Sequence, residues 1–181
     1  MDKYTGAIAA HYLDKRPLSW KWRFEQDAVQ EFLTILKPGT VLDAPVGTGR
    51  FAPIYKQLGI SATGLDISQD MLSQVEGMPT VCGDILTHSG DYDCVVCIRL
   101  LNWFNTDKLF QALENIARIG RHAVISITTA EKAFTWHTGA HIHAESDVLG
   151  KIKDCGWIVS DSRSASLDKG ATAWMMVLDP N

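Results

Sequence analysis

Residues 41–51, with the sequence VLDAPVGTGRF, decide the fold of this chain. An apolar run ends at Asp43, and Gly47 and Gly49 follow just before a segment with helical character. Glycine lets a backbone turn sharply and pass close to a ligand, and the free N–H groups at a helix N-terminus can face that ligand. The stretch therefore predicts a strand, a loop that binds a nucleotide-type cofactor, and a helix.

Strand-like and helical patterns alternate on both sides of this stretch. Periodic apolar residues predict helices near residues 25–36, 53–58, 69–75 and 107–119. Ser68 and Thr106 are expected to cap the last two of these helices. Short apolar runs predict strands near residues 41–43, 62–66, 79–82, 92–98 and 123–127. This alternation predicts a parallel sheet with helices on both faces.

The last part of the chain changes pattern. Ser146 is expected to cap a helix that runs to residues 155–156, and residues 157–163 and 171–178 are strand-like. The polar stretch between these strands is too short for the crossover that parallel neighbours need, which predicts an antiparallel hairpin at the sheet edge. The expected fold is therefore α/β and doubly wound, with a mostly parallel, seven-stranded sheet and a C-terminal antiparallel hairpin.

The chain has 181 residues, of which 46% are hydrophobic. That is enough for one well-buried domain and too little for two, so we expect a single domain over residues 1–181. A net charge of −4 and a pI near 5.8 favour small-molecule or protein substrates over nucleic acid or a membrane surface. The N-terminus lacks a leader pattern, and no segment approaches the roughly 20 apolar residues of a membrane span, which predicts a cytoplasmic protein.

Cys94 and Cys97 have the spacing of a redox or zinc motif. They lie inside a predicted strand, where side chains three positions apart point to opposite faces. We therefore expect them to be core thiols.

Taken together, these features resemble the class I S-adenosylmethionine-dependent methyltransferases, from about residue 25 to the C-terminus. The first motif of that family, an acidic residue and a glycine-rich loop after the first strand, matches Asp43, Gly47 and Gly49. The resemblance implies that this loop, with Ala44 and Pro45, holds the methionine part of S-adenosylmethionine. Pro45 replaces the usual first glycine, so the loop is retained if that position needs neither a positive φ nor an N–H donor.

Two further acidic residues match later motifs of the family. Asp66 ends the second predicted strand, 17 positions after Gly49, and the resemblance implies that it accepts hydrogen bonds from the ribose hydroxyls. Gly83 and Asp84 match the third motif, in which the Asp contacts the adenine amino group and the next residue, Ile85, packs on the ring. A structural cap at Asp66 and an ordinary Gly-Asp turn remain the alternatives.

Other residues are assigned around the same cofactor. Ile67 and Met71 line the adenine pocket in one interpretation and belong to the core in the other. Arg99 follows the fourth strand, in the segment that in this family borders the sulfonium and the substrate. The family resemblance also makes residues 1–24 a lid, whose Trp22 or Arg23 reaches the cofactor's carboxylate, or else an amphipathic helix.

A nicotinamide-dependent oxidoreductase is the remote alternative, because residues 47–52 satisfy the GxGxxA fingerprint. Three residues separate Asp43 from Gly47, which is typical of the methyltransferase loop. The dinucleotide fingerprint usually starts its glycines at the strand end. The terminal hairpin and Gly83-Asp84 also favour a methyltransferase.

The sequence says less about the residues that would bind the methyl acceptor. Residues 136–143, with the sequence WHTGAHIH, contain His137 and His141. These two histidines and Arg99 are the candidates for a catalytic role, in which the histidines would act as a general base. Loop structure or metal ligation would also account for these histidines, but no acidic or cysteine set completes a metal signature, and no metal is predicted. The segment after the fourth strand lacks the Asn/Asp-Pro-Pro-aromatic pattern of enzymes that methylate base amines.

The expected function is methyl transfer from S-adenosylmethionine to an O or N atom of a small-molecule acceptor. The alternative is a protein that binds the cofactor in another role, as a non-catalytic subunit, a lyase or a cyclase. The sequence leaves open the acceptor, the use of a general base and the oligomeric state.

Overall fold

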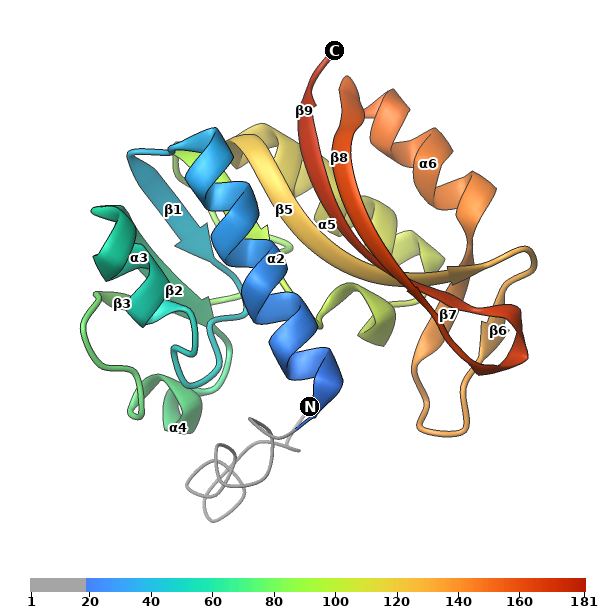
Figure 1. Cartoon of the computed structure of the whole chain (residues 1–181), viewed down its shortest axis with the longest axis horizontal. Coiled ribbons are helices and arrows are strands. Elements are labelled where there is room, and N and C mark those ends of the chain that lie inside the picture. Colours follow the sequence, from blue (N-terminus) through green and yellow to red (C-terminus); the bar gives the residue numbers. More distant parts are fainter. Residues whose placement is uncertain (1–18) are drawn as a thin grey trace. The chain divides into compact units, whose positions relative to one another are not determined.

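The computed structural model describes residues 19–181 (Figure 1). The described residues form two compact units, which divide between His88 and Ser89. Residues 1–18, the larger part of the predicted lid, lie outside the described residues. The expectation of one domain over residues 1–181 stays a prediction.

The first unit is built on three parallel strands in the order β3-β2-β1. Its strands are β1 (Thr40–Asp43), β2 (Ser61–Asp66) and β3 (Thr80–Cys82). Its helices are α2 (Trp20–Leu36), α3 (Ala52–Leu58) and α4 (Gln69–Leu72). The predicted alternation of strands and helices is confirmed here.

Helix α2 begins five residues before the predicted start at residue 25. Ser19 caps it, its side chain accepting a hydrogen bond from the Trp22 N–H at 3.2 Å, and the helix ends where Lys37 adopts a left-handed conformation. Trp22 and Arg23, for which a lid and an amphipathic helix were the alternatives, therefore belong to a helix. The helix buries the apolar face that predicted it, which consists of Ala28, Val29, Phe32 and Leu33.

Helix α4 is shorter than predicted. The Ser68 hydroxyl caps it by accepting from the Met71 N–H at 3.3 Å, as expected. The helix ends at Leu72, however, rather than at Val75.

The second unit carries the remaining elements. They are β4 (Tyr92–Cys97), η1 (Leu101–Trp103), α5 (Thr106–Ile119), β5 (Gly120–Ala130), β6 (Phe134–Thr135), β7 (His141–Ala144), α6 (Glu145–Asp154), β8 (Trp157–Ser166), η2 (Asp168–Gly170) and β9 (Thr172–Pro180). Strand β5 pairs parallel with β4 and antiparallel with β9, and β9 pairs antiparallel with β8. The predicted C-terminal hairpin is thus confirmed, with Ala123 opposite Leu178 and Thr129 opposite Thr172.

Three details of the second unit differ from the predictions. Asn105, not Thr106, caps α5, because its side chain accepts from the Lys108 N–H at 3.0 Å. Ala144, not Ser146, precedes α6, and the Ser146 hydroxyl instead bonds to Asp147. Strands β6 and β7 form a further antiparallel pair, so the residues that the structure describes contain nine strands rather than seven.

The fold class is nevertheless the expected one: mixed α/β, with a mostly parallel sheet and a C-terminal antiparallel hairpin. Cys94 and Cys97 are both fully buried in β4 and both free, which confirms that they are core thiols. Both faces of this strand are covered, as is usual for parallel sheets.

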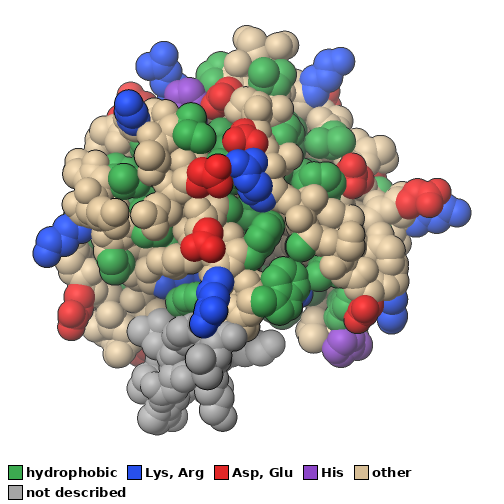
Figure 2. Space-filling model, viewed as in Figure 1, with side chains coloured by type: hydrophobic (Ala, Val, Ile, Leu, Met, Phe, Trp, Pro, Cys, Tyr) green, Lys and Arg blue, Asp and Glu red, His purple; other side chains and the backbone are tan. Residues whose placement is uncertain are grey.

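The surface carries charges of both signs. On the face shown in Figure 2, acidic and basic side chains are interspersed. Among residues 19–181, no helix has the length and apolar character needed to cross a membrane.

Candidate cofactor site

The glycine loop connects β1 to α3 and has the backbone that its sequence predicts. Gly47 and Gly49 adopt positive φ values of 57° and 76°. A Cβ atom added to Gly49 would lie 3.0 Å from Val75 Cγ1, so space as well as conformation restricts that position. Pro45 follows a cis peptide bond with Ala44, and the positive φ values fall on the two glycines. The proline therefore occupies a position that its restricted φ allows.

Asp66, at the end of β2, holds this loop. Its Oδ2 accepts a hydrogen bond from the Gly47 N–H at 3.0 Å, and its Oδ1 accepts from the Ser68 N–H at 2.9 Å. Burial raises the pKa of Asp66, and the backbone N–H donors oppose that shift. The Ile67 N–H is a third backbone donor to this carboxylate. A carboxylate has about four acceptor positions, so these three donors leave room for a further donor.

Asp43, at the end of β1, is almost completely buried at 1% exposure. Burial raises its pKa to about 7, against the opposing effects of the Tyr55 hydroxyl and the Arg50 guanidinium. Its Oδ2 and the hydroxyl of Thr48 are buried without a hydrogen-bond partner among the described residues. Such orphaned polar atoms are costly in a folded protein and are characteristic of sites that receive a polar ligand.

The third predicted motif lies next to Asp66. The Gly83 N–H donates to the Asp66 carbonyl at 3.0 Å, which joins the end of β3 to the end of β2. The exposed Asp84 accepts from the Leu86 N–H at 3.0 Å through Oδ1. This bond is the one that an ordinary turn would make, and it leaves the second carboxylate oxygen for another donor.

The apolar residues assigned to the adenine pocket divide by exposure. Ile85 and Met71 are buried, whereas Ile67 is 44% exposed directly after the end of β2. Met71 also approaches the loop, because a Cβ atom on Gly47 would lie 3.5 Å from its Cε. An exposed isoleucine beside Asp66 is an apolar surface that a flat ligand can cover.

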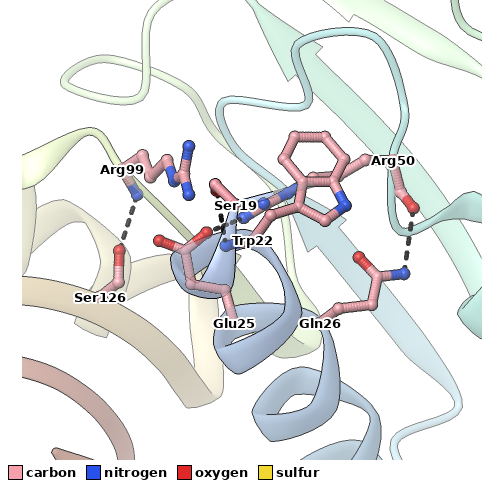
Figure 3. Close-up of polar contacts among 7 residues, drawn as sticks. All are labelled: Ser19, Trp22, Glu25, Gln26, Arg50, Arg99 and Ser126. Atoms are coloured by element: carbon pink, nitrogen blue, oxygen red, sulfur yellow. Dashed lines mark hydrogen bonds and ion pairs between the residues drawn. The ribbon is translucent and has the colours of Figure 1, made fainter. Parts of the chain in front are cut away.

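One cluster at the loop was not predicted from the sequence (Figure 3). Arg50 Nη2 pairs with Glu25 Oε2 at 2.7 Å, and both side chains are only 11% exposed. The guanidinium also lies 4.5 Å from the ring centre of Trp22 and 4.3 Å from that of Phe51. Glu25 is 25 positions from Arg50, so no local pattern could have paired them.

Arg99 belongs to the second unit, in the segment after β4. Its N–H donates to the Ser126 hydroxyl at 2.7 Å (Figure 3), and it adopts a left-handed φ of 64°. A positive φ is uncommon for a residue with a side chain and is found preferentially at functional sites. This backbone conformation carries no signal in the sequence.

Asn102 binds the same segment to strands β5 and β7. These contacts were not predicted from the sequence. Its side-chain amide donates to the carbonyls of Thr128 at 2.9 Å and His141 at 2.6 Å. Its Oδ1 accepts from the Thr128 N–H at 2.8 Å. The turn η1 is therefore held to the end of β5 and the start of β7.

The two candidate histidines differ in position and exposure. His137 is exposed in the turn between β6 and β7, and His141 lies half-buried on β7, its ring 6.2 Å from that of His143. His143 is buried, and burial lowers its pKa. Among residues 19–181, no group of three or more His, Cys, Asp or Glu side chains is placed to hold a metal ion.

Comparisons with known proteins bear on these features together. A family model described as a methyltransferase domain matches residues 42–126, which include the glycine loop, Asp66, Gly83-Asp84 and Arg99. The chloroplastic magnesium protoporphyrin IX methyltransferase of Arabidopsis thaliana is 27% identical, over 67% of this chain and 47% of that protein. This chain thus spans about half the length of that relative.

Solved structures share the fold. The magnesium protoporphyrin IX methyltransferase of Synechocystis PCC 6803, with bound SAH, has a TM-score of 0.77 and 17% identity, covering 98% of this chain and 96% of that chain. The 1,6-didemethyltoxoflavin-N1-methyltransferase of Burkholderia thailandensis has a TM-score of 0.67 and 16% identity, covering 96% and 87%. The chain is thus similar to a methyltransferase domain over residues 42–126, and it shares its fold with these solved methyltransferases.

Proposed function

We propose that this chain binds S-adenosylmethionine on its first unit and transfers the methyl group to an O or N atom of a small-molecule acceptor. The observation that carries the proposal is the bond from the Gly47 N–H to the Asp66 carboxylate. It joins the glycine loop to the acidic strand end, the two features that this cofactor needs together.

The residues present suit the chemistry of this cofactor. Asp43 Oδ2 and the Thr48 hydroxyl are buried polar atoms that can receive a polar or cationic group such as the amino group of the methionine part. Asp66 keeps an acceptor position that suits a ribose hydroxyl. The exposed Ile67 offers an apolar surface beside that carboxylate.

The proposed cofactor contacts follow the motifs. The backbone of Ala44, Pro45, Gly47 and Gly49 surrounds the methionine part, with Asp43 behind it. Asp66 accepts from the ribose, and the adenine is received by the third motif and its neighbours, Gly83, Asp84, Ile85, Ile67 and Met71. Arg99 is proposed to border the reacting end of the cofactor.

When bound, S-adenosylmethionine supplies a methyl group on a sulfonium that is already a good leaving group. The work of the chain is to bind and orient the two reactants, which can lower a barrier by about 7–11 kcal/mol without a nucleophilic side chain. His137 and His141 are the proposed groups for accepting a proton from the acceptor, where one must be removed.

The relatives support the small-molecule class of acceptor. Magnesium protoporphyrin IX and 1,6-didemethyltoxoflavin, the compounds that name two of them, are both small molecules. The net charge of −4 supports the further proposal of no nucleic-acid partner, and a cytoplasmic location is proposed beside it.

The test of the proposal is a screen for methyl transfer. The protein is incubated with S-adenosylmethionine carrying a labelled methyl group and with fractionated metabolite pools, and labelled products are identified by mass spectrometry. Transfer to an O or N atom of a small molecule is the expected result. Binding of the cofactor without transfer to any acceptor would contradict catalysis by this chain and favour the non-catalytic, lyase or cyclase alternatives.

Asp66→Ala is expected to weaken binding of S-adenosylmethionine by about 1–3 kcal/mol, or roughly 5- to 150-fold, because the ribose loses its acceptor and the loop loses its anchor. Titration calorimetry measures the affinity. Asp70→Ala, which removes an exposed acid on α4, serves as the control and should bind like the wild type. Unchanged affinity in a folded Asp66→Ala protein would remove Asp66 from the site.

A further inference from the structure

We propose that Glu25 and Trp22 are positioning residues for the cofactor loop, which they hold in its binding conformation through Arg50. The inference rests on the proposed binding of S-adenosylmethionine by this loop. It adds to that proposal a contact from the N-terminal turns of α2, which lie outside the glycine loop and the two later acidic motifs.

Three residues of α2 contact one residue of the loop (Figure 3). Glu25 Oε2 forms the ion pair of 2.7 Å with Arg50 Nη2, and the Trp22 ring lies 4.5 Å from the guanidinium carbon. Gln26 Nε2 donates to the Arg50 carbonyl at 3.5 Å. Both the side chain and the backbone of Arg50 are therefore held from the same helix.

The spacing of these residues explains how one helix reaches Arg50. Positions i, i+3 and i+4 lie on one face of a helix, and Trp22, Glu25 and Gln26 have this spacing. They occupy the first two turns of α2, directly after the Ser19 cap. The predicted apolar face begins only at Ala28, so these turns are fastened to the loop by polar and aromatic contacts.

The loop transmits a movement of Arg50 to the glycines. The Gly49 N–H donates to the Val46 carbonyl and the Ala52 N–H donates to the Gly49 carbonyl, both at 3.0 Å. Residues 46–52 therefore form consecutive tight turns, in which rotation at Arg50 changes the backbone at Gly49. Gly49 already has a positive φ, and Gly47, two residues earlier, donates to Asp66.

The charge of Arg50 also reaches the orphaned acid of the site. The guanidinium favours the ionised form of Asp43 and so opposes the rise in its pKa. Arg50 thus interacts with two acids, through an ion pair with Glu25 on α2 and through its charge with Asp43 at the end of β1. Replacing a buried ion pair with well-packed apolar residues is often neutral or stabilising, so stability alone does not explain this pair. It is better explained by the specific position that it gives to Arg50.

The experiment measures binding of S-adenosylhomocysteine by titration calorimetry for the wild type, Glu25→Gln, Arg50→Gln and the double variant. We expect each single variant to bind at least 5-fold more weakly. The double variant should bind no more weakly than Arg50→Gln, because the two residues act as one unit. Asp27→Asn, which removes the same charge from an exposed position of α2, should stay within 2-fold of the wild type.

Hydrogen exchange and thermal melting separate positioning from simple stability. In Glu25→Gln, backbone exchange at residues 47–50 should rise while exchange in β1 and β2 stays unchanged. A lowered melting temperature with unchanged affinity and unchanged loop exchange would overturn the inference. If Glu25→Gln does not fold, Trp22→Leu tests the same contact, with at least 3-fold weaker binding expected and unchanged binding overturning it. Failure of the wild type itself to bind would instead overturn the proposed function.

Discussion

Asp43 is an acidic residue that the fold removes from water. It is buried at the end of β1 with one carboxylate oxygen unpartnered among the described residues. Burial raises its pKa from 3.8 to about 7, so the folded chain keeps this proton over a pH range in which the unfolded chain has released it. Stability that depends on Asp43 is therefore fully present below about pH 4 and is lost as the pH rises through about 7.

Asp43→Asn should remove this pH dependence, because asparagine does not titrate. We expect the free energy of unfolding of the wild type to fall relative to the variant between pH 4 and pH 7, at up to about 1.4 kcal/mol per pH unit, and the difference to level off above pH 7. Urea denaturation at pH 5 and pH 8 measures it. Parallel pH profiles for the two proteins would contradict the raised pKa, and exposed Asp91→Asn provides the control.

At the scale of elements, the close approach of the loop to β2 sets the geometry of the site. The Val46 N–H donates to the Leu65 carbonyl at 2.9 Å, and the Val46 side chain lies over Gly64. A Cβ atom on Gly64 would be 2.8 Å from Val46 Cγ2, which is closer than real Cβ atoms come to their neighbours. Glycine at position 64 is thus required by packing rather than by backbone conformation.

Gly64→Ala should destabilise the protein by about 1–3 kcal/mol, because the added methyl overpacks the space under Val46. Adding Val46→Ala to that variant removes the nearest atom and should recover part of the loss. The free energy of unfolding in urea measures both effects. Gly150→Ala in α6, where an added Cβ meets nothing within 4 Å, should be neutral or stabilising by up to about 1 kcal/mol.

Elements with a strong local signal could be predicted from the sequence, and contacts between distant residues could not. The buried runs of β1, β2 and β4 and the apolar face of α2 follow from local periodicity alone. The cap of α5 was misassigned because the neighbours Asn105 and Thr106 are both suited to capping. Helix α6 begins after Ala144, whose side chain forms no cap, so no capping residue marks its start. Strands β6 and β7 are too short to show an alternating pattern.

In the candidate site, too, residues within a local motif could be predicted and contacts between distant residues could not. Asp43, Gly47 and Gly49 follow one another within a single motif, and Asp66 lies at a spacing that the strand-helix-strand unit imposes. The Glu25–Arg50 pair and the Asn102 contacts join segments about 25 residues apart or more, and the tertiary fold alone brings them together. The left-handed backbone of Arg99 likewise depends on its surroundings, because arginine has no local preference for it.

At the scale of the whole molecule, a ligand that binds only the folded state must raise its stability. At a ligand concentration 100 times the dissociation constant, this effect is about 2.7 kcal/mol. For a chain of this size each kcal/mol shifts the melting temperature by about 2–4 °C.

S-adenosylmethionine at 100 times its dissociation constant is therefore expected to raise the melting temperature by roughly 5–10 °C. Differential scanning fluorimetry measures the shift, with NAD at the same concentration as the control. A shift with NAD and none with S-adenosylmethionine at millimolar concentration would favour the oxidoreductase alternative.

The distribution of the four cysteines makes the cofactor site open to selective labelling. Cys82 is exposed, whereas Cys94 and Cys97 are buried and Cys155 is half-buried, with burial raising the pKa of the Cys155 thiol. Thiol reagents attack exposed thiolates, so a maleimide dye should attach first to Cys82. This cysteine pairs in register with Asp66, so a fluorophore there would report occupancy of the site without any engineered residue.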